Sequence, residues 1–136
     1  MPLSKIRLGV AAIILAAACR SEPKRVATPS LIGWRAVASW SGHGNAQPET
    51  FTVDSYPWRV RWETSRESPP GAGTFKALVR SADSGSAVLL AADHPGVGRD
   101  TTYVAERHRA FYLAIDSSNI DWSVTIEEPI VGQEAR

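Results

Sequence analysis

The fold of this chain is decided by the stretch Trp58-Arg59-Val60-Arg61-Trp62-Glu63. Successive side chains of a β-strand point to opposite faces, so the three apolar residues share one face and the three charged residues share the other. A strand of this kind covers a core on one side and meets water on the other. The stretch therefore predicts an antiparallel sheet that is packed on one face.

The same alternation recurs along the chain at spacings of about 8–12 residues, between segments rich in Gly, Pro, Asn, Asp and Ser. Strands are expected at 34–41, 51–53, 58–63, 74–81, 87–91, 101–106, 111–116 and 122–127. No stretch after residue 33 keeps the helical period of about 3.6 residues over a helix length. We expect an all-β fold, an antiparallel β-sandwich or jelly roll of about eight strands.

Three further expectations concern the packing of these strands. The five Trp residues are expected on inner faces, as parts of the core: Trp34, Trp40, Trp58, Trp62 and Trp122. The strand at 87–91 is apolar on both faces, so it should be covered on both sides or lie against the N-terminal segment. Residues 93–100 contain a Pro and two Gly and are expected to be irregular, with a flexible hairpin at 96–98.

The N-terminus has the pattern of a bacterial secretion signal. Lys5 and Arg7 are followed by the apolar stretch 8–15 and by three Ala residues that end at Cys19. The apolar stretch is shorter than the roughly 20 residues that a membrane-spanning helix needs. Because Cys19 is the only cysteine, the sequence also excludes an intramolecular disulfide and a thiolate metal cluster.

The placement of Cys19 directly after three Ala residues resembles the lipobox of bacterial lipoproteins. This resemblance implies removal of residues 1–18, a diacylglyceryl thioether on Cys19 and acylation of the new amino terminus. The alternative is an ordinary signal peptide that leaves Cys19 free. Arg20 is not the Asp that marks inner-membrane retention in enteric bacteria, so delivery to the outer membrane is expected if the host has one.

The remaining chain divides into three parts by composition. Residues 19–33 are expected to be a lipid-anchored tether, 34–128 the β-sandwich domain, and 129–136 a C-terminal tail. The tether contains Arg20, Lys24 and Arg25 against one acidic residue, Glu22, and basic residues are attracted to anionic headgroups by about 1 kcal/mol each. A linker that simply stays in solvent is the alternative.

A set of structural motifs spans residues 34–128: Trp40-Ser41-Gly42, Phe51-x-Val53, Pro57-Trp58-x-Val60-x-Trp62, Phe75, Gly96-x-Gly98, Phe111-Tyr112-Leu113-x-Ile115 and Trp122-x-Val124. Together they resemble a small β-sandwich domain found in many secreted bacterial lipoproteins of unknown function. A looser, architectural likeness is to the jelly-roll modules appended to secreted peptidases. Neither resemblance implies catalytic residues, and a fold alone does not confer an activity.

Charge and motif content exclude several classes of function. Subtracting Lys5 and Arg7 from the 15 basic residues leaves 13 against 14 acidic residues, or −1 from Cys19 onward. A nucleic-acid partner is therefore not expected, because it calls for a basic patch on a domain of high pI. The chain has no G-x-S-x-G and no closely spaced pair of zinc ligands, so neither an enzyme nor a metal or other cofactor is expected.

Two sets of residues are candidates for ligand binding. Arg59, Arg61, Lys76 and Arg80 would form an outward basic stripe if their strands are neighbours. Such a stripe suits an acidic glycan or an acidic protein patch. The alternative is a solvated sheet face whose charges Glu63 and Glu127 partly neutralise.

Tyr56 and Tyr112 are the aromatic residues expected at the surface, where they would offer a platform for a sugar ring. The turn that contains Asp116, Asn119 and Asp121 is the nearest approach to a calcium site. The simpler interpretation is that these side chains bond to the backbone of their own turn.

From the sequence we thus expect an envelope lipoprotein whose sandwich is a non-catalytic binding or structural module. Its expected partners are the lipid bilayer, through acylated Cys19, and an envelope protein or acidic glycan. The alternative is a polysaccharide-binding domain that uses its loops and an outward basic face.

Overall fold

A computed structural model describes residues 29–107 and 109–133. Cys19, the expected signal peptide and most of the expected tether lie outside the described residues. Within them the chain forms eight strands: β1 (Pro29–His43), β2 (Phe51–Val53), β3 (Trp58–Ser65), β4 (Thr74–Ser81), β5 (Ala87–Pro95), β6 (Gly98–Val104), β7 (Arg109–Ser118) and β8 (Asp121–Gln133). No helix long and apolar enough to cross a membrane occurs in this part of the chain.

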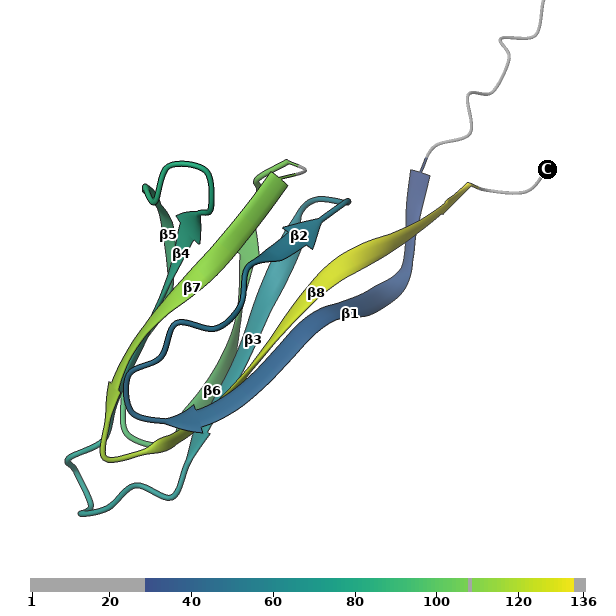
Figure 1. Cartoon of the computed structure of the whole chain (residues 1–136). Coiled ribbons are helices and arrows are strands. Elements are labelled where there is room, and N and C mark those ends of the chain that lie inside the picture. The colour runs from purple at the N-terminus through teal and green to yellow at the C-terminus, as the bar shows by residue number, and fades with distance from the viewer. Residues whose placement is uncertain (1–28, 108, 134–136) are drawn as a thin grey trace, which may run out of the picture.

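The strands form two antiparallel sheets of four, packed face to face (Figure 1). Sheet A has the order β1-β8-β3-β6 and sheet B the order β2-β7-β4-β5. Most strands that follow one another in the sequence lie in different sheets, and this arrangement is that of a jelly roll. The expected all-β sandwich of about eight strands is confirmed.

Aromatic side chains fill the space between the sheets. Trp58 from sheet A lies 5.0 Å from Phe111 of sheet B, between ring centroids, and Trp62 lies 5.4 Å from Phe75. The charged neighbours of these Trp residues on β3 point away from the core, so β3 has the two faces that its sequence predicts. Three of the five Trp are buried and a fourth, Trp40, packs against the core from β1.

Trp34 is the exception, and its expected place in the core is wrong. The register of β1 against β8 slips by one residue between Ala36 and Ala38, which marks a β-bulge. One inserted residue reverses the face of every side chain beyond it. Ala38 is paired with inward-facing Ile126, whereas Trp34 is paired with Pro129, on the outward side.

Strands β5 and β6 also differ from expectation. Residues 93–100 are not irregular, because β5 runs to Pro95 and β6 begins at Gly98. The two strands belong to different sheets, so residues 96–97 form a crossing between layers and not a hairpin of paired strands. Leu90 is 48% exposed, so β5 is not covered on both of its faces.

The pair β1 and β8 continues past the expected ends of the domain. Residues 29–33, expected in the tether, and 129–133, expected in the tail, are paired strands: Pro29 pairs with Gln133 and Leu31 with Val131. Figure 1 shows these paired ends projecting beyond the body of the sandwich. We call the part formed by residues 29–34 and 129–133 the terminal ribbon.

Candidate functional site

The expected basic stripe does not exist as one surface. Arg59 and Arg61 lie on β3 in sheet A, while Lys76 and Arg80 lie on β4 in sheet B. On each strand these residues alternate with buried ones, so each pair faces outward from its own sheet. The two pairs therefore lie on opposite sides of the sandwich. The stripe requires β3 and β4 to be neighbours in one sheet, and the jelly-roll topology places them in different sheets.

The outer face of sheet A carries an aromatic and charged cluster near the terminal ribbon. The Arg59 guanidinium lies 3.9 Å above the Trp34 ring, and its Nε donates to Glu127 at 2.7 Å. Trp34 also contacts Tyr103 of β6, with ring centroids 5.9 Å apart. Arg59 is largely covered, whereas Tyr103 is 56% exposed. Tyr103 is therefore the member of this cluster whose ring is open to a ligand.

Glu127 neutralises the two Arg residues of β3 in part. It accepts from Arg59 and, at 3.4 Å, from Nη1 of Arg61. The Arg61 side chain is 56% exposed and the Arg59 side chain 18% exposed. Arg61 is consequently the one of the two that a ligand could reach.

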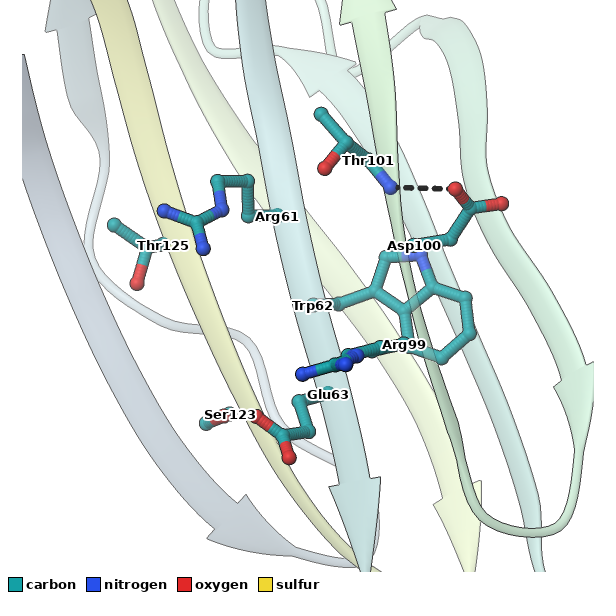
Figure 2. A pocket seen from close by; sticks show the side chains of 8 residues that line it. All are labelled: Arg61, Trp62, Glu63, Arg99, Asp100, Thr101, Ser123 and Thr125. Atoms are coloured by element: carbon teal, nitrogen blue, oxygen red, sulfur yellow. Dashed lines mark hydrogen bonds between the residues drawn. The ribbon is translucent and has the colours of Figure 1, made fainter. Parts of the chain in front are cut away.

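Next to this cluster is a shallow depression of about 420 Å³ on three adjacent strands. It is lined by Arg61, Trp62, Glu63, Arg99, Asp100, Thr101, Ser123 and Thr125. Figure 2 shows Arg61 extending toward Thr125 of β8, while Arg99 of β6 lies beside Glu63 of β3. The depression thus combines two guanidinium groups, the Glu63 carboxylate and three hydroxyls on an open face, whereas Asp100 pairs in register with inward-facing Trp62 and its side chain points away from that face.

A second depression, of about 710 Å³, lies on the side of the first that is remote from the terminal ribbon. The two are continuous, since Glu63 and Ser123 line both. Here Nδ1 of His43 lies 2.8 Å from Oδ1 of Asp121. The Ser41 and Ser65 side chains line the same depression. In the described part of the chain, no serine is hydrogen-bonded to His43, and both His43 and Asp121 are open to solvent.

The two tyrosines expected at the surface lie on separate parts of the molecule. Tyr56, in the loop between β2 and β3, is 44% exposed and has the Arg107 guanidinium 4.5 Å from its ring centroid. Tyr112 is half-buried on the outer face of sheet B, opposite Arg80 in register. The structure brings neither of them to the depressions on sheet A.

The turn proposed as the nearest approach to a calcium site uses two of its three side chains within the protein. Asn119 donates to the carbonyl oxygen of Ala72 at 3.1 Å, and Asp121 pairs with His43. Within residues 29–107 and 109–133, no group of three or more His, Cys, Asp or Glu side chains is placed to hold a metal ion.

A buried carboxylate holds the inner side of β8 to the loop after β2. Glu128 is 2% exposed and accepts hydrogen bonds from the backbone N–H groups of Asp54, at 2.7 Å, and Ser55, at 3.2 Å. Its other oxygen accepts from Arg35. Burial alone would raise the pKa of Glu128, but the bonds from Arg35 and the two backbone groups outweigh burial and hold that pKa below its ordinary value.

Sequence reasoning missed the two side chains that distinguish this face, Arg99 and Tyr103. Arg99 fell in a segment expected to be irregular. Tyr103 lies between Thr102 and Val104 on a strand. Because apolar Val104 points inward, the neighbouring side chain of Tyr103 can be inferred to point outward. Comparison of the chain with protein-family models, with curated protein sequences and with solved structures found no match.

Proposed function

We propose that this chain is a membrane-anchored envelope lipoprotein whose sandwich is a non-catalytic binding module, and that the outer face of sheet A is its binding surface. The observation that carries the proposal is the depression between β8, β3 and β6, which two solvent-facing Arg residues share with three hydroxyls. The expected lipidation of Cys19 supplies the location, on the membrane surface outside the cytoplasm.

The lining of the depression favours a glycan with carboxylate groups. Arg61 and Arg99 can pair with carboxylates through parallel N–H donors. The Thr101, Ser123 and Thr125 hydroxyls can both donate to and accept from sugar hydroxyls. Glu63, which lies beside Arg99, limits the net positive charge, which disfavours a densely charged polyanion.

The aromatic cluster fits the same class of ligand. Tyr103 stands with an exposed ring on the strand that also carries Thr101, and Trp34 and Arg59 support it from the side. An exposed aromatic ring can pack against the apolar face of a sugar. A chain of sugars lying along β6 would then meet Tyr103 and the depression together.

An open sheet face does not favour catalysis. Enzymes gain much of their rate from preorganised donors in sites that exclude water. His43 and Asp121 are paired as in a catalytic dyad, but their side chains are 62% and 37% exposed. The pair is better suited to hold the ends of β1 and β8 together than to activate a nucleophile.

The binding surface is tested with uronic-acid polysaccharides, alginate and polygalacturonate, and with neutral dextran as the uncharged comparison. The test variant is Arg61→Gln with Arg99→Gln, and the matched control is Lys76→Gln with Arg80→Gln on sheet B. We expect the first variant to lose at least about tenfold in affinity, or ~1.4 kcal/mol, and the control to bind as the native chain does. A native chain that binds none of these polymers, or equal losses in both variants, would refute the proposed surface.

The anchor is tested separately, by metabolic labelling of the producing bacterium with radioactive palmitate. We expect label on the native chain and none on Cys19→Ser, with the variant released from the membrane fraction. An unlabelled native chain that is recovered in the soluble fraction would contradict the lipoprotein assignment.

A further inference from the structure

The terminal ribbon concentrates apolar surface at one end of the domain. In the described part of the chain eight large hydrophobic side chains are exposed, and four of them lie on this ribbon. They are Leu31 at 57%, Ile32 at 68%, Ile130 at 42% and Val131 at 53% exposure. An exposed apolar cluster of this kind marks a contact surface for another molecule or for a membrane.

The exposed aliphatic side chains occupy both faces of the ribbon. Leu31 is opposite Val131 in register, on the face that continues to Trp34. Ile130 directly precedes Val131 and so points to the other face, where Ile32 lies against Gly132. A partner protein that docks on one face would leave the other face in water. A lipid surface, into which the ribbon enters end-on, covers both.

The position of the ribbon in the chain gives the second argument for lipid. Only residues 20–28 separate Cys19 from β1, and a segment of that length reaches roughly 30 Å when fully extended, at about 3.3–3.6 Å per residue. A membrane that anchors Cys19 therefore keeps the ribbon within that distance of its surface. The same segment carries Arg20, Lys24 and Arg25 against the single Glu22, and this excess of positive charge suits anionic headgroups.

A third argument comes from the loop between β2 and β3, which lies at the same end of the sandwich as the ribbon (Figure 1). It presents Tyr56, whose half-exposed ring is covered on one side by the Arg107 guanidinium. Tyrosine is enriched at membrane interfaces, where its ring lies at headgroup depth, and Arg can place its charge among phosphates.

We propose that the terminal ribbon inserts its four exposed aliphatic side chains into the surface of the bilayer that holds Cys19. This proposal rests on the proposed lipid anchor and adds an orientation to it. The domain stands on the ribbon, and the loops between β3 and β4 and between β7 and β8 point away from the membrane. The depression lined by Arg61 and Arg99 then lies on the side wall, where a polysaccharide outside the membrane can reach it.

The experiment uses the processed chain from Cys19 to Arg136, which contains every described strand and core residue. Its only cysteine is coupled to a maleimide phospholipid in phosphatidylcholine vesicles, so an anchor is present whether or not the cell acylates Cys19. Quenching of tryptophan fluorescence is compared between ordinary lipid and lipid brominated near the top of the acyl chains. Trp34 is the last β1 residue of the ribbon, and a Trp34→Phe chain gives the background from the other four Trp residues.

We expect bromine to quench the Trp34 signal in the native chain. The variant Leu31→Asn with Val131→Asn should lose at least half of that quenching, and it should fold normally because both side chains are exposed. The control Val97→Asn removes an aliphatic side chain that is 61% exposed at the opposite end, and it should leave the quenching unchanged.

Two outcomes would overturn the proposal. One is a Trp34 signal that brominated lipid does not quench. The other is a dimer of the uncoupled chain in light scattering that the ribbon variant dissociates, because a second copy would then cover the ribbon. Failure of palmitate labelling, by contrast, would remove the natural anchor and leave the vesicle result intact, so the two proposals fail separately.

Discussion

The variant Glu128→Gln tests how the buried carboxylate supports the fold. Hydrogen bonds to a charged group contribute about 1.5–3 kcal/mol and neutral ones about 0.5–1.5 kcal/mol, so each backbone N–H bond from Asp54 and Ser55 should weaken by roughly 1 kcal/mol. The Arg35 side chain is 60% exposed and regains water when the charge is lost. The amide is easier to bury than the carboxylate, which offsets part of the loss. We expect a free energy of unfolding about 1–2 kcal/mol lower at pH 7.

The pH dependence gives a sharper check than the magnitude. The pKa of Glu128 is lower in the folded chain than its ordinary value of 4.5. The stability that the carboxylate contributes is therefore complete above about pH 4.5 and is lost as the pH falls through the lowered pKa. Gln has no proton to gain. The difference in unfolding free energy between native chain and variant should therefore be constant from neutral pH to about pH 5 and shrink below about pH 4.5.

Urea unfolding followed by tryptophan fluorescence measures both quantities, because most of the Trp residues are in the core. Glu63→Gln serves as the control, since Glu63 is exposed on sheet A and its replacement should change the unfolding free energy by less than about 0.5 kcal/mol. A Glu128→Gln chain as stable as the native one at pH 7 would refute the role assigned to the carboxylate. So would a stability difference that stays constant down to pH 3.

Two further substitutions test packing and a buried hydrogen bond. Gly42→Ala would place a Cβ 2.6 Å from the buried ring of Trp122 and should lower the free energy of unfolding by about 1–3 kcal/mol. Gly33→Ala is the control, because a Cβ there has nothing within 4 Å and should leave the stability unchanged. Similar melting temperatures for the two variants in thermal unfolding would contradict this packing. Thr64→Val keeps the side-chain shape but removes the oxygen that accepts a hydrogen bond from the Gly98 N–H, 2.9 Å away. The free energy of unfolding should fall by about 1–3 kcal/mol, and hydrogen exchange at the Gly98 amide should become faster. Unchanged exchange there would show that the hydroxyl does not hold the crossing between the sheets.

Strand positions could be predicted from the sequence because most strands have one core face and one water face. Strands β2 and β4 have the predicted bounds, Phe51–Val53 and Thr74–Ser81, and the ends of the other strands differ by up to six residues. The bulge in β1 could not be predicted in the same way. Ala36, Val37 and Ala38 are all small or apolar, so the residue types do not show where the alternation shifts by one. The face of Trp34 depends on that shift.

The candidate site could be predicted only in its parts. The outward direction of Arg61 follows from the period of its strand, but its neighbours follow from the topology. Strand β3 lies between β8 and β6, which are distant in sequence, and not beside β4. The basic residue that lies near Arg61 is therefore Arg99 of β6, and not Lys76 of β4. Which distant strands pair with each other depends on the topology of the whole sandwich, and local sequence patterns do not predict it.

The position of β1 at the edge of sheet A has a mechanical consequence. A force applied at the N-terminus pulls on a strand that is hydrogen-bonded in sheet A only to β8, and it acts first at the pairing of Pro29 with Gln133. The bonds then break one after another, as in opening a zipper, and not all together in shear. The first β1 residue packed against the core is Val37. Several residues can thus peel away, each releasing about 3.3 Å of chain, before any load reaches the core.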